Sequence, residues 1–348
     1  MDRPQRRPGL LNTGGAAALA TVLAVFLAMG AAPLGGPPPL RAMRWLAPGA
    51  DAARILTHTP VECLTRSRSA EDTYRVEIGR AALRTPLLLG GQAARAGIAC
   101  ATCHRNGRSN PDFDFPGVSG APGTADVTSS LFSAHRGDDI DDPRPIPDLG
   151  GPKDRLKISQ AEGSPALKIF IRGLVTEEFD GPPPPPAVLD GLVAYVRALN
   201  PKACGPTATA PMRASSAAED VRRAVRAAQA ALARGDAPTA QVMVESARSQ
   251  LGDIAERYAG ADVALTRRRL GQADLDLAAA LESMRSPGPT DARERLATFL
   301  ARSDGWMSAV TRDEARSLYD PGVIAARLAA GAATPRHRPT SDARRARL

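Results

Sequence analysis

The chain is poor in aromatic side chains and in the residues that most often bind metals. Of its 348 residues, 4% are aromatic, four are Cys and four are His. Cys100 and Cys103 stand three positions apart, and no second pair has this spacing, so the ligands of a zinc site built from two such pairs are missing. From Ala218 onward there is no Cys, and the only His, His337, stands in the C-terminal tail. Nothing in that half is typical of a catalytic or metal centre.

An overall excess of one charge is also missing from the central part of the chain. The formal net charge is +8, but residues 1–59 and 336–348 each carry +4, whereas 60–205 and 206–335 carry −1 and +1. Both central segments are therefore near neutral, which excludes the basic footprint of a nucleic-acid-binding protein. The arginine-rich tail is typical of a disordered segment.

Charged residues are absent between Pro8 and Leu40, directly after a cluster of three arginines. An apolar run of about 17 residues, Ala16 to Ala32, lies in this stretch, and its length falls between a signal-peptide core and a minimal membrane span. We therefore predict that residues 1–32 are a cleaved signal peptide, with an uncleaved N-terminal anchor as the alternative. In either case the rest of the chain would lie in an oxidising compartment, the periplasm.

Cys100, Cys103 and the adjacent His104 form a C-x-x-C-H motif, the attachment signature of c-type haem. The spacing places both thiols on one helical turn, where each can add to a haem vinyl group, and His104 would bind the iron from the proximal side. A C-x-x-C alone would also fit a redox pair or half of a zinc site. The export signal favours one covalent haem c at these three residues.

The pattern along the chain predicts an all-α protein: a cytochrome c-like haem domain followed by a helical bundle or helical-hairpin domain. The predicted parts are a Pro/Gly-rich linker at 33–60, the haem domain at 61–205, the helical bundle at 216–331 and a basic disordered tail at 332–348.

Helices are expected in both parts. In the haem domain they begin after Glu71 and cover about 165–175 and 187–199, and a long irregular segment lies between residues 105 and 165. In the C-terminal part they cover about 218–234, 237–257, 261–285, 290–303 and 311–330.

Two stretches carry a family resemblance that covers about residues 70–203. Gly79 to Gly90 followed by Ile98 to His104 resembles the haem-binding segment of class I c-type cytochromes, and more narrowly the domains of bacterial di-haem cytochrome c peroxidases and their MauG-like relatives. Ile146-Pro147-Asp148-Leu149 is similar to an I/T-P-x-L stretch of that family. The resemblance implies a haem whose iron cycles between Fe(III) and Fe(II).

This chain departs from those peroxidases because it has one C-x-x-C-H motif, whereas they need two haems. That favours a periplasmic mono-haem cytochrome that exchanges electrons with redox partner proteins. The alternatives are a peroxidase-like haem enzyme acting with a partner haem protein, and a haem-based sensor or interaction protein. We expect the C-terminal helices to serve as a docking module, and a membrane to be contacted only through an uncleaved N-terminal anchor.

The sixth iron ligand is not where class I cytochromes usually carry it, because no Met stands between His104 and Ala187. His135 is the only His in that interval and is our candidate for the distal axial ligand. The alternatives are a surface position for His135, His58 or Met212 reaching the iron, and an open five-coordinate iron. A bis-His haem would have a lower potential than a His/Met haem.

Four acids follow His135 and offer oxygen ligands for Ca²⁺; they are Asp138, Asp139, Asp141 and Asp142. Their spacing is not that of an EF-hand, which favours a solvated acidic turn over a calcium site.

Cys63 and Cys204 remain once the haem pair is assigned, and they flank the predicted haem domain. In an oxidising compartment, two such cysteines favour one disulfide that ties the ends of the domain together. Two buried free thiols are the alternative.

Overall fold

The computed structural model describes residues 40–128, 131–133, 142–152, 156–204, 209–285 and 289–333. They are mostly helical, as the sequence predicted. The predicted export signal at 1–32 and the tail from 334 lie outside the described residues. No helix within the described ranges has both the length and the apolar character needed to span a bilayer.

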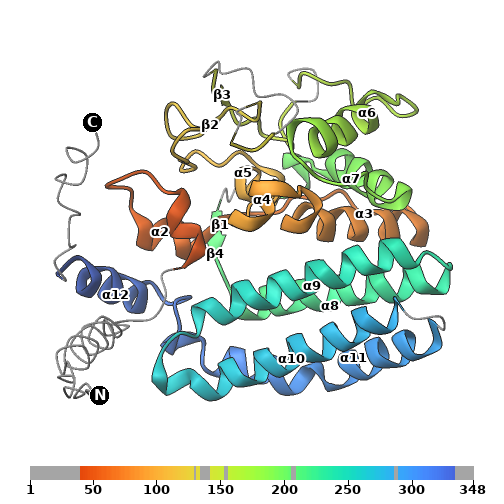
Figure 1. Ribbon diagram of the computed structural model, residues 1–348. Coiled ribbons are helices and arrows are strands. Elements are labelled where there is room, and N and C mark those ends of the chain that lie inside the picture. The colour runs from red at the N-terminus through yellow and green to blue at the C-terminus, as the bar shows by residue number, and fades with distance from the viewer. Residues whose placement is uncertain are drawn as a thin grey trace, which may run out of the picture. The chain divides into compact units, whose positions relative to one another are not determined.

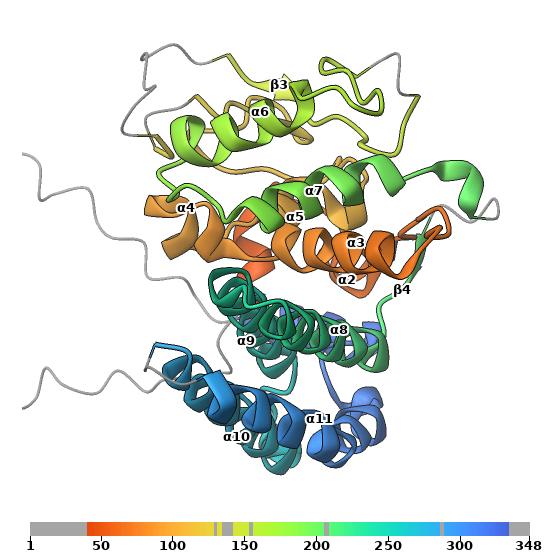
Figure 2. The same cartoon turned by 90° about the vertical axis from the view of Figure 1, so that its right-hand side faces the viewer.

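The elements follow one another in layers in Figures 1 and 2. Before residue 205 they are η1 (Arg41–Trp45), α2 (Ala52–Thr57), β1 (His58–Pro60), α3 (Ala70–Leu83), η2 (Pro86–Leu88), α4 (Gly91–Ala96), α5 (Cys100–Cys103), η3 (Arg105–Gly107), β2 (Thr124–Ala125), β3 (Arg144–Pro145), α6 (Ala166–Gly173), the π-helical turn η5 (Leu174–Glu178), α7 (Pro186–Ala198) and η6 (Pro201–Ala203). After it they are β4 (Thr209–Pro211), α8 (Ala214–Ala233), α9 (Ala237–Arg257), η7 (Ala261–Val263), α10 (Ala264–Ser283), α11 (Pro289–Arg312), η8 (Glu314–Arg316) and α12 (Pro321–Ala333).

Helix α3 begins where the sequence predicted and packs directly on α7. The hydroxyl of Ser69 accepts a hydrogen bond from the Asp72 N–H at 3.0 Å, which caps the first turn. The two helices approach most closely at Gly79 and Gly191, where a Cβ on Gly79 would lie 2.0 Å from the Gly191 carbonyl oxygen. Only glycine fits this crossing, because any side chain would separate the two backbones.

The segment from Leu40 to Pro60 is folded, although the sequence favoured a linker over residues 33–60. It forms η1, α2 and β1, and β1 pairs antiparallel with β4. The physical reason is burial: Leu40, Ile55 and Leu56 are 3–4% exposed. Leu40 and Leu56 pack with Ile324 of α12, so this segment contacts the C-terminal end of the described chain.

The C-terminal half contains four long helices, α8 to α11, that pack on one another (Figure 1). The predicted boundaries of α9 agree with the structure, but the expected helix over 311–330 is wrong. Instead, α11 continues to Arg312 and the chain turns before α12 begins at Pro321. The break lies at the buried side chain of Asp313, which accepts hydrogen bonds from the Thr266 hydroxyl and from two arginines. Proline at 321 cannot continue the preceding helix.

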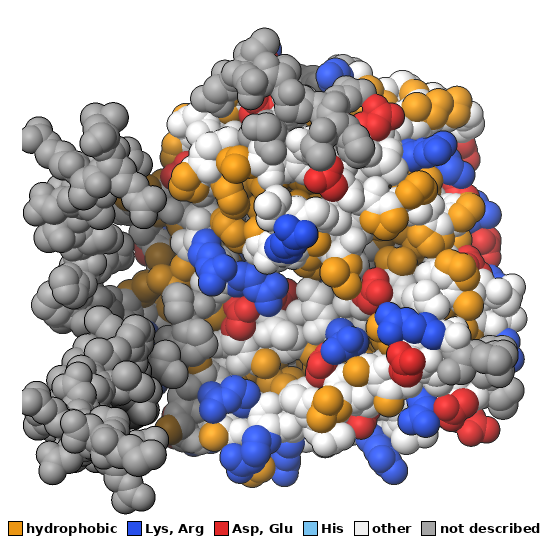
Figure 3. Space-filling model, viewed as in Figure 1, with side chains coloured by type: hydrophobic (Ala, Val, Ile, Leu, Met, Phe, Trp, Pro, Cys, Tyr) orange, Lys and Arg blue, Asp and Glu red, His pale blue; other side chains and the backbone are white. Residues whose placement is uncertain are grey.

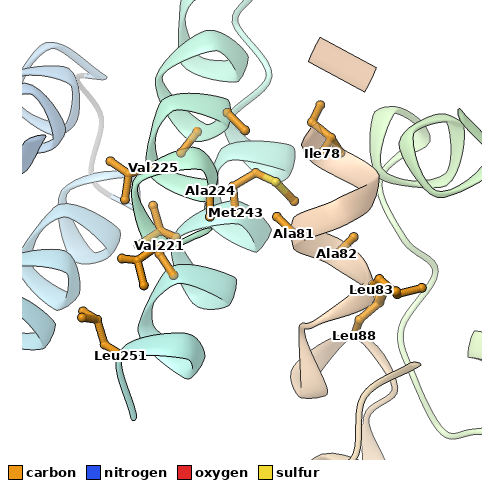
Figure 4. Close-up of a cluster of buried hydrophobic side chains, with 14 of the residues drawn as sticks. Ile78, Ala81, Ala82, Leu83, Leu88, Val221, Ala224, Val225, Met243 and Leu251 are labelled. Carbon is orange, nitrogen blue, oxygen red and sulfur yellow. The ribbon is translucent and has the colours of Figure 1, made fainter. Parts of the chain in front are cut away.

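Helix α3 lies between α7 and the C-terminal helices, so one buried cluster runs through both halves. Figure 4 shows Met243 of α9 beside Ala81 of α3, with Val221 and Ala224 of α8 in the same cluster. The hydroxyl of Ser246 donates to the Ala81 carbonyl at 2.7 Å. The small residues of α3 allow this close approach.

Candidate functional site

The three residues of the C-x-x-C-H motif lie on one turn. Helix α5 spans Cys100–Cys103, and the His104 N–H donates to the Cys100 carbonyl at 2.8 Å. The Thr102 hydroxyl accepts from the Ala99 N–H at 3.0 Å and closes the turn at its start. Both cysteines are free and partly buried. The spacing that the sequence shows is therefore realised as one side of a short helix.

The imidazole of His104 is held by a backbone carbonyl. Its Nδ1 lies 3.1 Å from the Pro147 oxygen. A carbonyl oxygen only accepts hydrogen bonds, so Nδ1 carries the proton and Nε2 carries the lone pair. Burial lowers the pKa of His104 to about 4, against the opposing effects of the Pro147 carbonyl and the Asp148 charge. The ring is therefore neutral at pH 7, which is the state that can bind a metal.

The Ile146–Leu149 stretch, which the sequence singled out, is fastened to the chain that follows the motif. Arg108 Nε donates to both Asp148 carboxylate oxygens at 2.8 Å. The Leu149 N–H donates to the Gly107 carbonyl at 3.1 Å. These contacts fix the Pro147 carbonyl opposite His104.

The turn after the motif depends on Asn106, which has a φ of 51°. Asparagine tolerates this left-handed conformation better than most residues. Its amide nitrogen donates to the Pro60 carbonyl at 2.8 Å, and its side-chain oxygen accepts from Arg84 Nη2 at 2.9 Å. The turn is thereby attached to β1 and to the end of α3.

The thiols do not have the character of a redox pair. Burial raises the pKa of Cys100 to about 11 and that of Cys103 to about 12. A reactive C-x-x-C needs a lowered thiol pKa, because the thiolate is the nucleophile. Within the described ranges, no group of three or more His, Cys, Asp or Glu side chains is placed to hold a metal ion, so half of a zinc site finds no other half there.

The predicted disulfide is confirmed: Cys63 and Cys204 are bonded, with their Cα atoms 5.3 Å apart. Leu64 and Leu199 form a β-bridge beside it, and the Asn200 N–H donates to the Cys63 carbonyl at 2.8 Å. The bond joins the chain before α3 to the chain after α7.

The other predicted ligands are placed only in part. His135 and the acidic residues 138–141 lie outside the described residues, whereas Asp142 donates its backbone N–H to Asp126 at 3.1 Å. The His58 ring is 3.1 Å from the Thr57 hydroxyl. Met212 Sδ lies 3.5 Å from Arg257 Nη2, in a cleft that the opposite side of α5 lines through Ala101 and Thr102.

Sequence reasoning missed a buried charge network beside the motif. Glu62 is the centre: its carboxylate pairs with Arg80, accepts from Arg84 Nη2 at 2.9 Å and accepts from the Tyr195 hydroxyl at 2.7 Å. Arg80 also lies 3.2 Å from Asp220 of α8, which connects the two halves. An acid at position 62 next to a cysteine gives no periodic pattern, so no sequence feature indicated this role.

No protein-family model, curated protein or solved structure matches this chain.

Proposed function

We propose that this chain is a mono-haem c-type cytochrome that is exported to the periplasm and carries electrons between redox partner proteins. The observation that carries the proposal is the geometry around α5: two protonated thiols on one turn, followed by an imidazole whose Nδ1 is engaged by the Pro147 carbonyl. Residues 61–205 would be the haem domain, and α8 to α11 would be the helical docking module.

Each residue has a distinct part in this proposal. Cys100 and Cys103 would anchor the haem through thioethers, which are uncharged and suit the partly buried position of both sulfurs. His104 would bind the iron through Nε2, because its other nitrogen is engaged. When bound, haem c supplies an iron that accepts and releases one electron. A histidine ligand whose second nitrogen is hydrogen-bonded keeps its tautomer and ring orientation, which tunes the metal.

The surrounding structure supports electron transfer over a dithiol or zinc role. The raised pKa values of both thiols disfavour thiolate chemistry. The Ile146–Leu149 stretch, on which part of the cytochrome resemblance rests, lies against the motif through the bonds of Arg108 and Leu149. The single C-x-x-C-H favours an electron carrier over a two-haem peroxidase.

The test is to mature the full chain in a strain able to attach haem c. Denaturing electrophoresis with haem staining should show covalent haem in the parent chain and none in the double variant Cys100→Ser/Cys103→Ser. The matched control is Cys63→Ser/Cys204→Ser, which removes the other two cysteines and should retain the haem. Absence of covalent haem in the parent chain would overturn the proposal.

Optical and EPR spectra before and after dithionite then identify the iron ligands. With His135 as the distal ligand we expect a low-spin spectrum without the absorption band typical of a Met ligand, and a change to high spin in His135→Ala. The control His58→Ala should leave the spectrum unchanged. An unchanged spectrum in His135→Ala would show that the ligand assignment is wrong. A high-spin parent that responds to peroxide or CO would favour the peroxidase-like or sensor function.

A further inference from the structure

A cleft of about 810 Å³ lies between the N-terminal segment and the C-terminal helices, on the side of α5 that carries Ala101 and Thr102. Its volume is within the range of small-molecule sites, about 300–1,000 Å³. In Figure 3, side chains of both charges gather between α2 and α9, where this cleft lies. Because Cys100, Cys103 and His104 do not line the cleft, it is separate from the proposed haem site.

Part of the cleft wall is apolar. Trp45, Leu56 and Ile254 line it, and they come from η1, α2 and α9. They are at most 9% exposed, so they form a firm floor within the core. An apolar part of a ligand would be stabilised there by removal of its surface from water.

Two guanidinium groups in the cleft have only neutral partners. Arg105 Nη2 donates to the carbonyls of Ile55 and His58, at 3.0 and 2.5 Å. Arg257 Nη1 donates to the Leu318 carbonyl at 2.9 Å. In the part of the chain that the structure describes, no carboxylate lies within ion-pair distance of either group.

The positive charge of these groups is therefore not compensated locally. Burial lowers the pKa of Arg105; Asp112 raises it, and the charges of Arg257 and Arg54 lower it further. By contrast, Arg41 of the same cleft lies 2.9 Å from a Glu256 carboxylate oxygen. An arginine has five N–H donors, so Arg105 and Arg257 both retain donors for an anion.

We propose that the cleft binds a small organic monocarboxylate with an apolar body, its carboxylate at Arg105 and Arg257 and its body against Trp45, Leu56 and Ile254. A carboxylate matches the planar donor geometry of guanidinium groups. A single negative charge is favoured over a dianion, because two carboxylates, Asp253 and Glu256, also line the cleft and would repel the second charge.

The test is isothermal titration calorimetry on the full holo chain with three probes: octanoate, 1-octanol and acetate. Octanol keeps the apolar body without the charge, and acetate keeps the charge without the body. We expect octanoate to bind at least about tenfold more tightly than either, since hydrogen bonds to charged groups contribute this order of affinity. Equal binding of octanoate and octanol, or no binding of octanoate, would overturn the proposal. Because the readout is heat of binding, it does not depend on the haem assignment.

Three variants locate the site. Arg257→Gln should weaken octanoate binding about tenfold. Arg257 is buried, so a second variant is needed that does not alter the core: Asp253→Asn, whose side chain is 60% exposed, should tighten binding by about twofold or more. The matched control is Arg302→Gln, at an exposed position of α11, which should leave binding unchanged. A loss in Arg302→Gln equal to that in Arg257→Gln, or an unchanged affinity in Asp253→Asn, would refute the site.

Discussion

Glu62 is the buried acid on which the contact between the two halves depends, and its replacement by Gln gives the sharpest test of the fold. Its side chain is 9% exposed and meets Arg80, Arg84 and Tyr195. Burial raises its pKa, but Arg84 and Arg80 lower it further, and the pKa in the folded protein is about 2. Its ordinary value is 4.5. The ionised form is thus favoured by folding.

The size of the effect follows from this difference. Each pKa unit corresponds to about 1.4 kcal/mol, so ionised Glu62 contributes about 3 kcal/mol to the free energy of unfolding at pH 7. Because the pKa in the folded state is below that in the unfolded state, this stability is present above pH 4.5 and is lost as the pH falls towards 2. The variant Glu62→Gln cannot ionise, and it leaves two guanidinium groups without their carboxylate.

The assay is urea denaturation followed by far-UV circular dichroism at pH 7, 5 and 3. Glu62→Gln should be less stable than the parent by about 3 kcal/mol or more at pH 7, and the difference should shrink as the pH falls below 4.5. The matched control is Glu71→Gln, since Glu71 is half exposed and pairs with arginines at the surface. It should cost less than about 1 kcal/mol. A difference between parent and Glu62→Gln that is constant from pH 7 to pH 3 would refute the reasoning.

Three further stability changes follow from single contacts and use the same denaturation assay. Tyr195→Phe removes a hydrogen bond to a buried carboxylate and should lower the free energy of unfolding by about 1.5–3 kcal/mol; no change would mean that the bond does not form in solution. Gly191→Ala places a Cβ 2.8 Å from the backbone of α3 and should cost about 1–3 kcal/mol or more, whereas Gly271→Ala, on an open helix surface, should stabilise by about 0.5–1 kcal/mol; equal effects would contradict the helix crossing. Replacing Cys63 and Cys204 together by Ser opens a loop of 141 residues and should cost about 5 kcal/mol by the chain-entropy relation, a value that an unchanged midpoint would refute.

The sequence alone could predict the features that depend on local spacing. The C-x-x-C-H motif predicts one turn because both thiols and the imidazole are close in the chain, and the structure has that turn. Apolar periodicity and capping residues predict α3, since the signals lie within the helix itself. The disulfide between Cys63 and Cys204 followed from counting cysteines in an oxidising compartment.

Other features were decided only when distant segments met. The linker prediction for residues 33–60 relied on composition, but the described part of that segment folds because Leu40 and Leu56 find an apolar partner in α12. The expected helix over 311–330 is interrupted because Asp313 meets Thr266, 47 residues away. Neither contact leaves a mark in the local pattern.

The same division holds at the candidate site. The sequence by itself determined which three residues carry the chemistry and that Ile146–Leu149 belongs with them by resemblance. The tertiary structure decided that the Pro147 carbonyl engages His104 Nδ1, that Glu62 joins two arginines and Tyr195, and that Arg105 and Arg257 share a cleft. These contacts are non-local: their partners lie 43 or more residues apart or are brought together by several elements, so their existence depends on the packing of α3, α7 and α9 and not on any spacing along the chain.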